Sequence, residues 1–170
     1  SPHVREKLRP FREDVTLDAA TASSLLVFSN DLRSAQCKKI HHDLTKDPRL
    51  ACVLGTPCFS SGQHYWEVEV GEVKSWSLGV CKEPADRKSN DLFPEHGFWI
   101  SMKAGAIHAN THLERIPASP RLRRVGIFLD ADLEEIQFFD VDNNVLIYTH
   151  DGFFSLELLC PFFCLELLGE

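Results

Sequence analysis

The segment LGTPCFSSGQHYWEVEV, from Leu54 to Val70, decides the fold of this chain. Its middle, Ser60-Ser61-Gly62-Gln63, is typical of a turn. After the turn, apolar and polar residues alternate, and this period of two predicts a half-buried strand. One side of the strand would carry Trp66, Val68 and Val70, and the other Tyr65, Glu67 and Glu69.

Similar short alternating segments recur along most of the chain, whereas helical runs are few. Residues 3–12 predict a short helix ended by Pro10, and residues 29–49 predict short edge strands and an exposed loop. The pattern as a whole predicts an all-β fold, an antiparallel β-sandwich of two sheets. We expect nine residues to lie between the sheets: Trp66, Val68, Trp76, Leu78, Val80, Val125, Ile127, Leu129 and Phe138. Trp99, like Trp66 and Trp76, is interpreted as a core residue first and a ligand contact second.

Length and charge narrow the range of functions. The chain has 170 residues, which favours one domain, and its net charge of −7 makes nucleic acid an unfavourable partner. No stretch approaches the roughly 18 apolar residues that span a bilayer, and we expect neither a membrane segment nor a signal peptide.

Six cysteines are present, but they form no C-x-x-C pair and several stand in apolar, strand-like surroundings. We therefore expect free buried thiols in a reducing compartment, with Cys160 and Cys164 packed as two thiols. The remaining cysteines are Cys37, Cys52, Cys58 and Cys81.

Catalytic and metal motifs are missing from the sequence. There is no G-x-S-x-G and no H-E-x-x-H. Cys37 with His41 and His42 has loosely metal-like spacing but too few ligands for a structural zinc site. The acidic run from Asp130 to Asp142 lacks the glycine of a calcium loop and is interpreted as solvated turn carboxylates. We predict no catalytic residue, no metal and no cofactor.

The Leu54–Val70 segment resembles a PRY–SPRY domain, and further motifs agree in the family's order. Two departures stand out: Ala19 replaces a proline, and Glu134 stands at a turn where the family commonly has glycine. If that turn needs a positive φ, Glu134 is strained by roughly 1–2 kcal/mol. The agreeing motifs are Val15–Asp18, Trp76–Cys81, Gly97–Trp99, Val125–Asp130 and Pro161–Phe163.

The resemblance implies a bent two-sheet sandwich with a short N-terminal helical segment. It implies a single PRY–SPRY domain over residues 1–170, with the PRY part at about 1–60 and the SPRY part at about 61–170. Within the family, the chain is most similar to ret-finger-protein-like and tripartite-motif (TRIM) proteins. The implied function is non-catalytic: a monomeric, intracellular (cytoplasmic or nuclear) module that recognises a target protein, as the substrate-recognition domain of a RING-type ubiquitin ligase-like protein.

The resemblance also implies where a partner binds. Positions carried over from relatives are Ser77, Ser101 and Lys103. Loop candidates are Arg33, Lys39, Lys74, Asp91, Phe93, His112, Phe153 and Phe154. For the adjacent pair Phe153 and Phe154, a partner contact and packing under a loop both remain open. An alternative function is a ligand-sensing domain that binds a small anionic metabolite among Lys103, Lys74 and Arg33.

Overall fold

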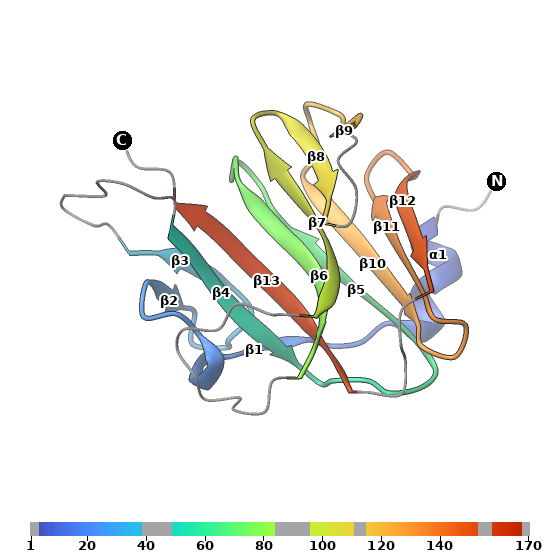
Figure 1. Ribbon diagram of the computed structural model, residues 1–170, viewed down its shortest axis with the longest axis horizontal. Coiled ribbons are helices and arrows are strands. Elements are labelled where there is room, and N and C mark those ends of the chain that lie inside the picture. Colours follow the sequence, from blue (N-terminus) through green and yellow to red (C-terminus); the bar gives the residue numbers. More distant parts are fainter. Residues whose placement is uncertain (1–3, 39–48, 84–95, 111–114, 153–157, 168–170) are drawn as a thin grey trace.

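Seven antiparallel strands form the larger of two main sheets, which we call the large sheet (Figure 1). The computed structural model describes residues 4–38, 49–83, 96–110, 115–152 and 158–167. The strand order across the large sheet is β1-β4-β13-β6-β7-β8-β9. The bounds are β1 Thr16–Asp18, β4 Arg49–Thr56, β6 Trp76–Lys82, β7 Gly97–Lys103, β8 Ala106–Ala109, β9 Arg115–Ile116 and β13 Leu159–Leu167.

Four strands form the second sheet, the small sheet, in the order β12-β11-β10-β5. Two more strands, β2 and β3, form a separate antiparallel hairpin. The bounds are β2 Leu26–Phe28, β3 Ala35–Cys37, β5 Gln63–Glu69, β10 Arg124–Asp130, β11 Glu135–Asp140 and β12 Val145–Asp151.

The core lies between the inner faces of the two sheets because the strands alternate as predicted. In β6, Trp76, Leu78 and Val80 are at most 3% exposed, whereas Ser77 lies half-buried on the opposite face. All nine residues expected between the sheets belong to this core or pack against it, with Val68 partly buried at its border. The predicted two-sheet β-sandwich is confirmed.

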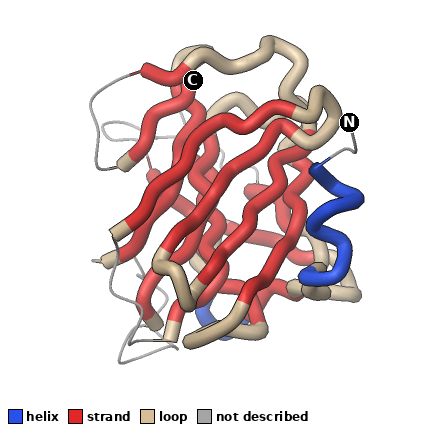
Figure 2. Tube along the Cα trace, turned by 90° about the vertical axis from the view of Figure 1, so that its right-hand side faces the viewer, coloured by secondary structure: helices blue, strands red, loops and turns tan. Residues whose placement is uncertain are grey.

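A short N-terminal segment lies over the outer face of the small sheet (Figure 2). The Phe11 ring lies 5.7 Å from that of Phe128, and the Arg5 guanidinium donates two hydrogen bonds to the Glu67 carboxylate. Tyr65, expected on the polar surface, is therefore fully buried. The segment consists of α1 (Val4–Leu8) and the 3-10 turn η1 (Arg9–Phe11); a second 3-10 turn, η2 (Ala19–Thr21), follows β1.

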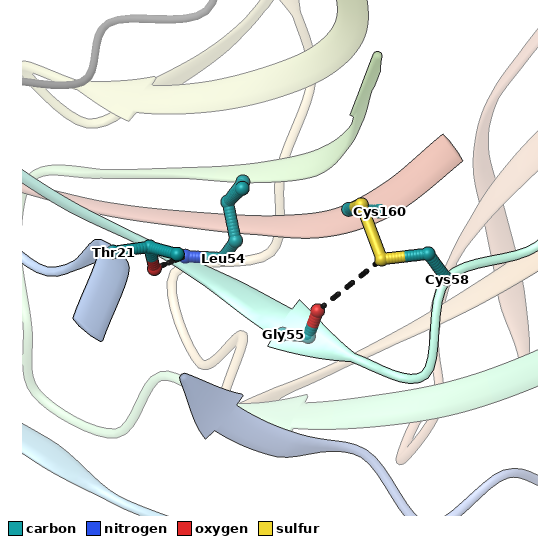
Figure 3. Close-up of a disulfide and its surroundings, with 5 residues drawn as sticks. All are labelled: Thr21, Leu54, Gly55, Cys58 and Cys160. Atoms are coloured by element: carbon teal, nitrogen blue, oxygen red, sulfur yellow. Dashed lines mark hydrogen bonds between the residues drawn. A yellow bond between two sulfur atoms is a disulfide. The ribbon is translucent and has the colours of Figure 1, made fainter. Parts of the chain in front are cut away.

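The expectation of six free thiols is wrong for two of them, because Cys58 and Cys160 form a disulfide (Figure 3). The two residues are 102 positions apart, but β13 pairs with β4 in the large sheet and brings their Cα atoms within 4.3 Å. Cys58 Sγ also lies 3.8 Å from the Gly55 carbonyl oxygen. The other four cysteines remain as thiols, as predicted.

The turn between β10 and β11 confirms one expectation and corrects another. Glu134 has a φ of 57°, the left-handed conformation that costs a non-glycine residue about 1–2 kcal/mol. Asp130 and Asp140, however, are buried rather than solvated. Asp130 accepts hydrogen bonds from the Gln63 side chain and a turn N–H, and Asp140 accepts from Asn143. Hydrogen bonds within the protein thus replace water around both carboxylates.

Candidate protein-binding face

The outward residues of β6 and β7 form one continuous surface on the large sheet. Inward residues alternate with them along both strands, so Ser77 on β6 and Trp99, Ser101 and Lys103 on β7 share the outer face. We call these four residues the β6–β7 face. The structure therefore brings together the three residues that the resemblance placed at the binding surface.

Ser77 and Ser101 are direct cross-strand partners, and their Oγ atoms lie 2.6 Å apart. One hydroxyl donates to the other, and the pair still has one donor proton and several lone pairs to offer. Ser101 is 8% exposed and Ser77 is more open. The centre of this face is therefore a small, neutral pair of hydroxyl groups, of which Ser101 is nearly buried.

Lys103 supplies the positive charge of the face. Its Nζ lies 3.5 Å from the Glu166 carboxylate on β13, so the ion pair reaches across β6. The Lys103 side chain is 52% exposed and that of Glu166 only 11%. The cation is thus accessible to a partner but already partly neutralised.

Trp99 is the residue of this face that the sequence interpretation placed wrongly in the sandwich core. Its ring centroid lies 5.3 Å from that of Phe162 on β13, and the side chain is half-buried. Gly79, its cross-strand partner, has no side chain, and a Cβ there would lie only 2.6 Å from Trp99 Cα. The sequence contained the signal for this placement. Trp99 and Ser101 are two positions apart on one strand, so their side chains lie on the same face of the sheet. Half-buried tryptophans are frequent binding hot spots.

The remaining predicted residues are dispersed or undescribed. Lys74 lies in the exposed turn before β6. Arg33 lies between β2 and β3, where hydrogen bonds from its guanidinium to Asp14 raise its pKa, with a further contact to Asp31. The residues outside the described part of the chain are Lys39, Asp91, Phe93, His112, Phe153 and Phe154.

The alternative metabolite site gains no support from this arrangement. Arg33 and Lys103 each pair with carboxylates, and neither Lys74 nor Lys103 lines the two cavities that lie beside β5. An anion would have to compete with those carboxylates for its cations.

The most strongly perturbed carboxylate lies away from the β6–β7 face. Burial alone would raise the pKa of Glu67, but hydrogen bonds from Arg5 and Tyr65 and the charge of Arg12 outweigh it and lower the pKa to about 2. Glu67 thus anchors the N-terminal segment as a permanent anion, which is a structural role.

Among the described residues, no group of His, Cys, Asp and Glu is placed to hold a metal ion. In the same part of the chain, no helix is long and apolar enough to cross a bilayer.

The two-sheet sandwich fixes the fold, and comparison with known proteins gives the family. The chain belongs to the PRY–SPRY family: the SPRY domain matches residues 63–170, and the SPRY-associated domain, PRY, matches residues 15–59. SPRY and PRY domains are non-catalytic binding modules, and the SPRY domains of TRIM proteins bind protein targets.

Three relatives place the chain within the family. It is 98% identical over 170 residues to human (Homo sapiens) Ret finger protein-like 4B, covering all of this chain and 65% of that protein. It is 42% identical to the E3 ubiquitin-protein ligase TRIM11 of Bos taurus, over 87% of this chain and 33% of the ligase. It is 39% identical to Butyrophilin subfamily 1 member A1 of Mus musculus, over 92% of this chain and 31% of that protein. The chain therefore spans only part of each relative.

Two solved structures share the fold. The TRIM65 PSpry domain superposes with a TM-score of 0.77 at 20% identity, covering 98% of this chain and 95% of that one. Stonustoxin superposes with a TM-score of 0.69 at 21% identity, covering 96% of this chain and 30% of the toxin. At these identities the likeness extends to the fold alone. The predicted resemblance to PRY–SPRY, ret-finger-protein-like and TRIM proteins is confirmed.

Proposed function

We propose that this chain is the target-recognition domain of a RING-type ubiquitin ligase-like protein and that its target docks on the β6–β7 face. The observation that carries the proposal is the grouping of Trp99, Ser77, Ser101 and Lys103 on two adjacent strands. An aromatic side chain beside small hydrogen-bonding groups and one accessible cation suits a protein surface. Ubiquitin transfer itself would belong to a separate RING domain.

We further propose that the PRY and SPRY parts act as one domain. Strand β4 belongs to the PRY part and β13 to the SPRY part, and they pair over six residue positions, from Phe162↔Leu54 to Leu167↔Arg49. Because this pairing lies inside the large sheet, neither part buries its apolar surface without the other. The loop residues predicted from the resemblance, among them Asp91 and Phe93, remain candidates for the rim of the same interface.

A paired capture experiment tests the proposal. The wild-type protein and the variant Ser77→Glu/Lys103→Glu are each used to capture partners from a cell extract, with quantification by mass spectrometry. The matched control is Ser60→Glu/Lys7→Glu, which makes the same two substitutions at exposed positions away from this face. The target is expected among the proteins that bind wild type and control but lose about tenfold or more with the face variant. A direct partner that binds all three proteins equally would show that the target docks elsewhere.

A further inference from the structure

A groove lies between β5 and the β2–β3 hairpin, away from the β6–β7 face. Both elements pack on the inner face of the large sheet, since the hairpin contacts Ala51 and Val53 and β5 belongs to the small sheet. Between them is a cavity of about 380 Å³, walled by residues 66–69 of β5, by Val70 directly after it, and by residues 33–35 of the hairpin. A second cavity of similar volume shares Val15, Arg33, Trp66 and Glu67 with it. We call the two together the β5 groove.

Strand β5 turns a free edge toward this groove. The Tyr65 carbonyl accepts a hydrogen bond from the Glu13 N–H at 2.8 Å, so the Tyr65 main chain points away from β10. Because main-chain direction alternates along an antiparallel pair, the N–H and C=O groups of Glu67 and Glu69 point the same way. The Val70 N–H, by contrast, donates to Arg123 on the β10 side, as the alternation requires. In the described part of the chain, β10 is the only strand that pairs with β5. On the other edge, β5 has a single bridge, between Tyr65 and Arg12.

Trp66 lies beside the groove. It lines both cavities and is 2% exposed. Among the described residues, its Nε1 is the one buried side-chain nitrogen or oxygen without a hydrogen-bond partner. This donor is itself buried within the sandwich, so a ligand in the groove does not reach it.

We propose that the β5 groove binds an extended segment of a partner protein by strand addition to β5. The segment's main chain would pair with the N–H and C=O groups of Glu67 and Glu69, a match that a small molecule does not offer. Its inward side chains would be small and apolar at alternate positions, because residues such as Val53, Leu78 and Leu165 form the floor.

The negative charge of Glu69 indicates which residue type the bound segment carries on its outward side. The Glu69 carboxylate is 58% exposed, and its contacts to Arg123 and Arg124 are loose, at 3.7 and 3.8 Å. A Lys or Arg opposite Glu69 on the incoming strand gains a cross-strand pair of opposite charge. The partner is therefore an extended segment with alternating small apolar residues and a basic residue on its outer side. This binding site is additional to the target-binding face proposed above.

The probe is a displayed library of random peptides of about ten residues, selected on the intact protein. Selected peptides are then synthesised and their affinities measured against two pairs of variants. Val73→Arg fills the mouth of the groove, and Val27→Arg makes the same change at a valine of similar exposure outside it. Glu69→Pro removes one edge N–H without touching the ladder to β10, and Glu69→Ala keeps that N–H.

We expect selected peptides with alternating apolar residues whose affinity falls about tenfold or more with Val73→Arg and with Glu69→Pro. Val27→Arg should stay within about threefold of wild type, and Glu69→Pro should bind about tenfold more weakly than Glu69→Ala, which itself loses only the exposed charge pair with the peptide. Bound peptide should also slow amide exchange at Glu67 and Glu69. Thermal melting of each variant shows whether it is folded, and the two test variants act by different means, so the failure of one to fold leaves the other.

The proposal is overturned if no peptide is selected, or if each selected peptide binds test and control variants equally. Peptides that lose affinity only with Ser77→Glu/Lys103→Glu would likewise overturn the groove while supporting the β6–β7 face. The two proposals therefore fail separately.

Discussion

The outer faces of the two sheets are held in different ways, and the contrast points to the one a partner can use. On the small sheet, the N-terminal segment lies over the face. It is held by the bidentate salt bridge between Arg5 and Glu67, in which the shortest nitrogen–oxygen distance is 2.7 Å. On the large sheet, the contacts described around Ser77 join strands of the same sheet, and the ion pair of Lys103 with Glu166 spans 3.5 Å. The first face is covered by the N-terminal segment, whereas on the second the Lys103 side chain stays 52% exposed.

The difference teaches that strong electrostatics alone does not mark a surface as a binding face. The Glu67 cluster has the stronger electrostatics, yet every charge in it serves the fold. The β6–β7 face has a weaker ion pair but an accessible cation and a half-buried tryptophan. Weakly engaged side chains on a rigid strand framework are better suited to bind a second molecule.

The framework of the β6–β7 face should tolerate substitution least at Gly79. A Cβ there would clash with the Phe98 carbonyl and lie 2.6 Å from Trp99 Cα, and both are main-chain atoms of the neighbouring strand. Because the β6–β7 ladder cannot widen without losing hydrogen bonds, we expect Gly79→Ala to lower the free energy of unfolding by about 3 kcal/mol. Urea denaturation measures the loss.

The control for this substitution is Gly105→Asn. Gly105 has no atom within 4 Å of an added Cβ, and asparagine tolerates its φ of +78°. We expect it to cost about 1 kcal/mol or less. Equal stability of the two variants would contradict the close approach of β6 and β7.

The alternation of side chains along each strand accounts for the part of the β6–β7 face that could be predicted from the sequence. The alternation in β6 and β7 is local, and with the resemblance it was enough to place Ser77, Ser101 and Lys103 on one face. The same alternation applied to Trp99 would have moved it out of the core. The burial of Tyr65 could not be predicted, because the residues that cover it come from the N-terminal segment more than fifty positions earlier.

Two other features depended on the arrangement of strands rather than on local pattern. The bond between Cys58 and Cys160 requires knowing that β13 lies beside β4, which spacing along the chain does not reveal. The free edge of β5 likewise depends on which strands flank it. The alternation of residues within β5 does not show whether the strand lies at an edge or in the middle of a sheet.

Acid should weaken the covered face. The pKa of Glu67 falls from its ordinary 4.5 to about 2 in the folded protein. At pH values between these two, Glu67 therefore binds more protons in the unfolded chain than in the folded protein. The stabilisation by Glu67 is therefore complete above about pH 4.5 and is lost as pH falls toward about 2. With allowance for the partial exposure of Arg5, we expect it to be worth about 2 kcal/mol.

The measurement compares wild type with Glu67→Gln by urea denaturation at about pH 6 and at about pH 3. The difference in unfolding free energy between wild type and Glu67→Gln should be larger at the higher pH and smaller at the lower pH. Glu69→Gln is the control, since that carboxylate is 58% exposed and should show no such gap. A gap for Glu67→Gln that does not change with pH would mean that the substitution acts through packing alone.

The ion pair of the β6–β7 face should contribute least to stability. Lys103 is half-exposed and its Nζ lies 3.5 Å from Glu166, so solvent screens the attraction. A double-mutant cycle with Lys103→Ala and Glu166→Gln should give a coupling energy of about 0.5 kcal/mol, decreasing with added salt. The same cycle with Arg5→Ala and Glu67→Gln should give a clearly larger coupling that salt reduces less, because the Glu67 side chain is only 5% exposed. If the Lys103 pair proved as strongly coupled as the Arg5 pair, the energy needed to break it would oppose binding. Lys103 would then be a structural residue of the large sheet rather than a contact for the target.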